Sequence, residues 1–117
     1  KANSGALVLA IVPNAYSLYH MFLQDKSVSF DGRNHLLYFS EKTLKAIFEQ
    51  SGFEVLYIDT VLTGIDNMNK QMQWLDPYAQ SSENKYLNNA LVDDVINEQY
   101  ILKNNLGLRL RIVAKLK

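Results

Sequence analysis

The chain has no cysteine among its 117 residues, so disulfide bonds and thiolate metal sites are excluded, as is usual for a cytoplasmic protein. Neither sign of charge is in excess, because 12 Lys and Arg residues balance 12 Asp and Glu residues. Such a chain has no basic field to attract nucleic acid or an anionic membrane. Its apolar runs are far shorter than a membrane span. We therefore expect a cytoplasmic protein with neither a nucleic-acid nor a membrane partner.

Glycine is scarce as well. The 5 glycines are isolated from one another, so the chain contains no glycine-rich loop of the kind that binds phosphate groups. The apolar fraction of 48% is typical of an ordinary globular protein. This length predicts a single domain over residues 1–117.

What the chain does have is a continuous apolar run over residues 6–12, closed by Pro13. Such a run is typical of a strand buried on both faces of a largely parallel sheet. A strand of this kind needs neighbours, so we expect the chain to be the back portion of a longer α/β protein. Its unpaired apolar edge invites pairing with another chain, which predicts self-association through that edge.

A long loop follows over residues 14–39, with a short helix expected over residues 16–22. Ser40 is a typical N-cap, Glu41 lies in the first turn, and Gly52 suits a C-cap, which predicts a helix over residues 41–51. Residues 53–59 are rich in β formers and predict the next strand. Strand, helix and strand together predict a βαβ unit with a right-handed crossover.

The segment over residues 61–105 is polar and interrupted, with helices expected over residues 69–74 and 84–104. Apolar side chains of this segment favour core packing or a subunit contact over a lid; they are Met68, Met72 and Trp74. The last strand, residues 108–116, alternates strictly between apolar and mostly basic residues. That alternation conflicts with a strand covered on both faces, and indicates either an open face or a different strand order.

These elements predict an α/β fold with flanking helices and a three-stranded mixed sheet, in which two parallel strands are accompanied by an antiparallel last strand. The order of motifs also resembles that of a known family. Val12-Pro13-Asn14 closes a strand, and His35 lies a few residues before Phe39-Ser40. Thr43-Leu44 then lies near the start of a helix, and Gly52-Phe53 opens a strand.

This pattern resembles the C-terminal half of class I S-adenosylmethionine-dependent methyltransferases, over residues 1–60 and 106–117. The resemblance implies a partial Rossmann-like fold, part of a seven-stranded sheet. Residues 6–12, 53–59 and 108–116 would be its fifth, sixth and seventh strands, with the seventh antiparallel between the other two. Residues 61–105 would then be an insertion between the last two strands.

The resemblance implies S-adenosylmethionine as cofactor, yet the family's glycine-rich loop and ribose-binding acid match no position here. No cofactor-binding residue is therefore assigned, and the chain alone is expected to be inactive. It would contribute the side of the active site that holds the methyl acceptor, a small molecule. The alternative is a complete, non-enzymatic α/β module for interaction or oligomerisation, since a shared fold does not establish activity.

Ligands of open α/β sheets lie at the carboxyl ends of the strands. The expected substrate-binding residues therefore lie in or beside the loop after the first strand, or at the start of the last strand: Asn14, Tyr16, Tyr19, His20, Tyr38 and Arg109. Aromatic walls and a cation suit a planar or anionic acceptor. His35 is the candidate catalytic base, because imidazole can take a proton near neutral pH.

Structural roles compete with these assignments. His35 could cap the helix or close the loop, and Arg109 and Arg111 could be solvated or paired with acids. A metal site of His20 and His35 with Asp25 or Asp31 lacks helical ligand spacing, so no metal is expected. A Ser17–His35–Asp59 hydrolase has no Gly-x-Ser-x-Gly motif to support it.

Overall fold

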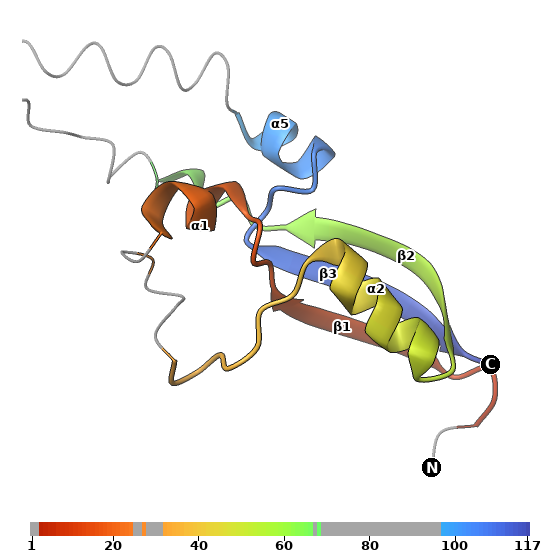
Figure 1. Cartoon of the computed structure of the whole chain (residues 1–117). Coiled ribbons are helices and arrows are strands. Elements are labelled where there is room, and N and C mark those ends of the chain that lie inside the picture. Colours follow the sequence, from red (N-terminus) through yellow and green to blue (C-terminus); the bar gives the residue numbers. More distant parts are fainter. Residues whose placement is uncertain (1–2, 25–26, 28–31, 67, 69–96) are drawn as a thin grey trace, which may run out of the picture.

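Three strands and a helix that crosses them form the centre of the molecule (Figure 1). The computed structural model describes residues 3–24, 27, 32–66, 68 and 97–117. The elements, in chain order, are β1 (Leu7–Pro13), α1 (Leu18–Leu23), α2 (Glu41–Gln50), β2 (Phe53–Val61), α5 (Glu98–Lys103) and β3 (Arg109–Leu116).

The three strands predicted from the sequence are confirmed, and so are the helices expected over residues 16–22 and 41–51. The helix expected over residues 69–74 lies outside the described residues. So does most of the helix expected over residues 84–104, of which α5 is the described part.

The sheet has the order β1-β3-β2, and β3 is antiparallel to both of its neighbours. The central, antiparallel position expected for the last strand is thus confirmed. The predicted fold class is nevertheless wrong, because every hydrogen-bonded strand pair is antiparallel in the described part of the chain. β1 and β2 run in the same direction, but β3 lies between them and takes up the hydrogen bonds that a parallel pair would share. The fold is a small α/β domain on an antiparallel sheet, not a Rossmann-like arrangement of paired parallel strands.

Helix α2 begins at a capping box. Ser40 Oγ accepts a hydrogen bond from Thr43 N at 3.1 Å, and Thr43 Oγ1 accepts one from Ser40 N at 2.9 Å. Together these bonds satisfy backbone donors that the first turn leaves free. The helix ends before Gly52, whose φ of +86° is a left-handed conformation that other residues rarely adopt. This short connection delivers the chain directly into β2.

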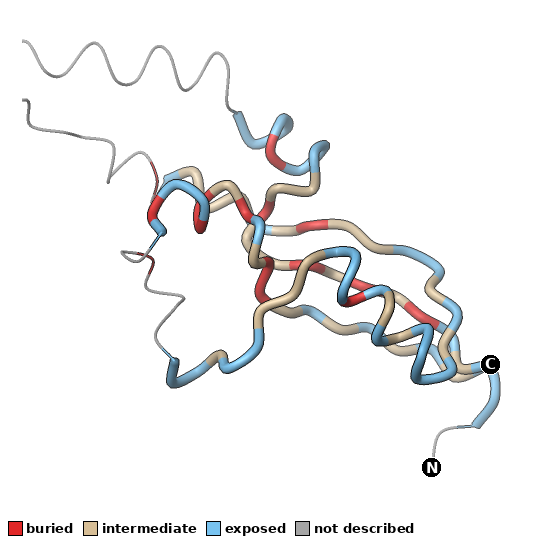
Figure 2. Tube along the Cα trace, viewed as in Figure 1, coloured by how far each residue is buried: buried red, intermediate tan, exposed pale blue. Residues whose placement is uncertain are grey.

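The core lies between α2 and one face of the sheet. Its most buried members are Leu44 of α2 and Leu110 and Ile112 of β3. Apolar side chains that are partly buried surround them: Ala10, Val12, Phe39, Phe48, Val55 and Ile58. Figure 2 shows the buried positions recurring along the central strand. Burial of this apolar surface is the main stabilising contribution to the fold.

The opposite face of the sheet is open. On β1, Leu7, Leu9 and Ile11 are 68%, 63% and 55% exposed, which shows that the expectation of a strand buried on both faces is wrong. No described helix covers this face, and only α2 lies across the sheet (Figure 1). This open face explains why apolar and mostly basic residues alternate along β3.

A second, smaller cluster lies beside the carboxyl end of β1. Tyr19 and Leu23 of α1 pack there with Met68. Leu18 N donates to Leu106 O at 2.9 Å, which ties α1 to the turn before β3. This contact brings the loop after β1 next to the start of β3.

Candidate functional site

Asn14 connects three parts of the chain at the carboxyl end of β1. Its side chain, only 2% exposed, donates from Nδ2 to Gly107 O at 2.8 Å and to Asn105 O at 3.3 Å. Its Oδ1 accepts from Tyr16 N at 3.1 Å. These polar atoms are bonded to the protein itself, so Asn14 holds the loop after β1 against the turn before β3. Its predicted contact with a substrate stays a prediction.

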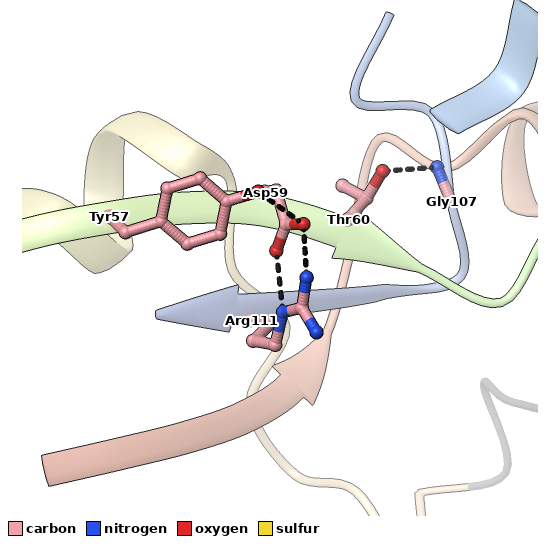
Figure 3. Close-up of polar contacts among 5 residues, drawn as sticks. All are labelled: Tyr57, Asp59, Thr60, Gly107 and Arg111. Carbon is pink, nitrogen blue, oxygen red and sulfur yellow. Dashed lines mark hydrogen bonds and ion pairs between the residues drawn. The ribbon is translucent and has the colours of Figure 1, made fainter. Parts of the chain in front are cut away.

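Gly107 lies against the end of β2. Its N–H donates to Thr60 Oγ1 at 3.0 Å (Figure 3), and a Cβ at this position would lie 2.9 Å from Thr60 Cβ. Only glycine allows this approach of the turn before β3 to β2 without displacement. Gly107 thus fixes the turn from which β3, and therefore Arg109, begins.

His20 lies in α1, which begins at the N-cap Ser17; Ser17 Oγ accepts from His20 N at 3.1 Å. The imidazole is 3% exposed, and its Nδ1 lies 2.7 Å from Asn14 O. A carbonyl oxygen only accepts, so Nδ1 carries a proton. The ring also packs edge-on against Tyr19, with 5.6 Å between centroids. Burial lowers the pKa of His20, and the nearby charge of Arg109 lowers it further, whereas the hydrogen bond to Asn14 opposes both.

His35 and Arg109 are in direct contact. Arg109 Nη1 lies 3.1 Å from His35 Nε2, and both side chains are partly buried. A guanidinium group has no acceptor, so Arg109 donates and His35 Nε2 accepts. The segment that carries His35 is held at the end of β1, because Ala15 N donates to Phe39 O at 2.8 Å and Phe39 N to Pro13 O at 3.3 Å.

Arg111 has a different partner on the same face of β3. Its Nε donates to Asp59 Oδ1 at 2.8 Å and its Nη2 to Asp59 Oδ2 at 2.5 Å (Figure 3). Tyr57 OH also donates to Asp59 Oδ2, at 2.9 Å. The hydrogen bonds from Arg111 are the main reason why the pKa of Asp59 is lowered. Pairing with an acid, the structural alternative considered for the two arginines, is thus confirmed for Arg111.

The structure brings most of the predicted site residues into two neighbouring groups. Asn14, Tyr19 and His20 are joined by the contacts above. Arg109 contacts His35, and its charge acts on His20. Tyr16 follows Asn14 directly but is 64% exposed, and Tyr38 is half-buried next to Phe39, which bridges to Asn14. Tyr57 and Thr60 were missed, and Asp59 was considered only as a member of a hydrolase triad. An acid two residues after a tyrosine in a predicted strand was the available signal, because both then lie on one face.

The other chemistries considered from the sequence find no support. Ser17 caps α1, and Asp59 pairs with Arg111, so neither lies in a triad with His35. Asp25 and Asp31 lie outside the described residues. Within the described ranges, no group of three His, Asp or Glu side chains could hold a metal ion.

Comparison with known proteins adds no relative. No protein-family model matches the chain, and neither a curated protein nor a solved structure matches it. Among the described helices, none has the length and apolar character needed to cross a membrane.

The titration of His20 predicts how stability depends on pH. Its folded-state pKa lies below the ordinary value of 6.5, so the unfolded chain binds the proton more tightly. The free energy of unfolding is expected to fall as pH drops below about 6.5, by at most roughly 1.4 kcal/mol per pH unit. Urea unfolding at a series of pH values measures this.

The control is His20→Asn, whose amide N–H can replace Nδ1–H as donor to Asn14 O. This variant should lose the dependence just below pH 6.5. It should keep the loss of stability below pH 3.8 to which Asp59 contributes, because that carboxylate has a lowered pKa. A slope near pH 6 that is equal in both proteins contradicts the assignment to His20.

Proposed function

We propose that the chain forms the methyl-acceptor side of an S-adenosylmethionine-dependent methyltransferase, and that its acceptor is a small molecule in the cytoplasm. The observation that carries the proposal is the contact between His35 Nε2 and Arg109 Nη1 at 3.1 Å. It puts a candidate base and a cation together beside the carboxyl end of β1. The motif order over residues 1–60 supports the same conclusion.

S-adenosylmethionine would supply an electrophilic methyl group, and the rest of the reaction needs alignment of the acceptor and removal of its proton. The described residues offer no glycine-rich loop for this cofactor, so none of them is assigned to it. Cofactor binding is proposed to need residues beyond the 117 of this chain, and the chain alone is proposed to be inactive.

His35 is the proposed base. In the observed arrangement its Nε2 accepts a hydrogen from Arg109. To take the proton of an acceptor O–H or N–H, Nε2 exchanges this hydrogen bond for one with the acceptor. Arg109 is then free to hold the acceptor with its N–H groups. Tyr16, which is 64% exposed, would supply aromatic surface beside it.

Calorimetry tests the proposal with two samples: the protein encoded by the full reading frame that contains this chain, and the chain alone. S-adenosylmethionine is expected to bind the first and not the second. The full-length protein should also transfer a labelled methyl group to small molecules of a cell extract. Absence of both binding and transfer in the full-length protein would overturn the proposal.

A second candidate function is self-association, which the exposed face of β1 favours. Asn14 N donates to Leu108 O, so the even-numbered residues of β1 share hydrogen bonds with β3. The backbone groups of Leu7, Leu9 and Ile11 therefore point to the outer edge of the sheet, which no other described strand covers. Because β1 carries no charged side chain, two copies can pair edge to edge without like-charge repulsion.

Leu9→Lys is expected to weaken such a dimer, because it places two ammonium groups close together across the paired edges. The dissociation constant of the dimer should rise about tenfold or more. Light scattering after size exclusion measures it over a range of concentrations. Leu56→Lys is the matched control, since Leu56 is 50% exposed on the opposite edge strand. A wild-type protein that stays monomeric throughout refutes the self-association.

A further inference from the structure

Arg109 and Arg111 lie two residues apart on the same face of β3, but their surroundings differ. Arg111 is opposite Asp59 on β2 and forms a bidentate ion pair with it. Arg109 is opposite Val61 on β2 and Pro13 on β1. The strand register therefore gives a carboxylate to one arginine and two apolar neighbours to the other.

The charge of Arg109 is not balanced within the described part of the chain. The ion pairs found there join Arg111 to Asp59 and Lys45 to Glu49, and none includes Arg109. Its hydrogen-bonding partner is the neutral acceptor lone pair of His35 Nε2. Its positive charge also acts on His20, where it disfavours the protonated imidazole and so lowers the pKa of that residue.

We propose that Arg109 is the anchor of a binding site for an oxyanion, a carboxylate or phosphate group on a small molecule, with His35 beside it. One N–H group of the guanidinium contacts His35, which leaves others for the anion. A planar guanidinium binds two oxygens of one carboxylate or phosphate at once. The partial burial of both side chains strengthens this attraction relative to a fully solvated arginine.

An oxyanion site on Arg109 specifies the chemical class of the methyl acceptor. The assignment of the oxyanion to a methyl acceptor rests on the proposed function, whereas oxyanion binding by Arg109 does not. An anion on Arg109 would draw the guanidinium away from His35 and so expose the Nε2 lone pair to the acceptor. The acceptor would then be an acid or a phosphate ester with an O–H or N–H group near its charge.

The two histidines provide the readout. The chain contains only His20 and His35, so labelling histidine with ¹³C gives two ring signals in an NMR spectrum of the full chain. Phosphate and acetate are titrated separately, with chloride replaced to keep the ionic strength constant. A saturable shift of the His35 signal is expected with at least one of the two anions. The anion that binds more tightly identifies the phosphate or carboxylate class.

The controls use the two arginines. Arg109→Gln should weaken anion binding about tenfold or more, and Arg109→Lys should weaken it less, because a charge remains without the planar fork. Arg111→Gln should change the affinity less than about twofold, since that side chain is engaged with Asp59. No saturable shift in the wild type, or equal binding by Arg109→Gln, overturns the site. The anion titration contains no S-adenosylmethionine, so its result stands even if the methyltransferase proposal fails.

Discussion

On the proposed methyltransferase function, replacing His35 by glutamine in the full-length protein is expected to lower kcat by about 10²-fold or more, the usual contribution of a general base. Glutamine offers an oxygen that can accept from Arg109 as Nε2 does, so the local hydrogen bond can persist. An amide cannot take the acceptor's proton near neutral pH. The rate of methyl transfer, measured with labelled S-adenosylmethionine, reports the loss.

A comparison of kcat with KM distinguishes a base from a structural residue. His35→Gln should lower kcat and change the KM for the acceptor by less than about twofold, because the amide can keep the contact with Arg109. The affinity for S-adenosylmethionine should remain unchanged, because no residue of this chain is assigned to the cofactor. If the variant retains the wild-type kcat, His35 is not the base.

Truncation of Ile112 is expected to have the largest effect on stability. This side chain is 0% exposed in the central strand, opposite Ala10 of β1 and Ile58 of β2. Ile112→Ala should lower the free energy of unfolding by about 2–5 kcal/mol, through lost burial and the cavity that remains. Hydrogen bonding of β3 on both sides keeps the backbone from closing that cavity. Urea unfolding measures the change.

Val113→Ala is the matched control for this substitution. Val113 is the next residue of β3, half-buried on the open face of the sheet. Its truncation should cost less than about 1 kcal/mol, because solvent already reaches the site. Equal losses for the two variants would show that the core does not lie between α2 and the sheet.

The elements of this fold could be predicted from local signals, whereas the burial of the faces of the sheet could not. Ser40 and Gly52 predicted the bounds of α2 within a residue. The apolar run of residues 6–12 led to a wrong prediction of the environment of β1, because composition does not show whether a strand is covered on both faces. The alternation of residues 108–116 carried the better information, since an open face, which the structure has, was one of the two explanations that it indicated.

Part of the candidate site could also be predicted from the sequence. The loop after the first strand was expected to hold His20 and His35, and the topology brings both close to the start of β3. The different partners of Arg109 and Arg111 could not be predicted. They depend on the register of β2 against β3, which includes a bulge between Val55 and Tyr57. Without the pairing, Asp59 cannot be assigned to either arginine.

The central position of β3 has a consequence for folding during synthesis on the ribosome. Leu7 pairs with Lys115, and Phe53 pairs with Leu116, so among the described strands neither β1 nor β2 has its partner until β3 has been translated. At about 5–20 residues per second, the nascent β1 waits several seconds with its leucines accessible. This interval is when a chaperone, or a neighbouring nascent chain, can capture it. Sheet formation is therefore expected to wait for β3 and to be slow, as for other folds dominated by contacts distant in sequence.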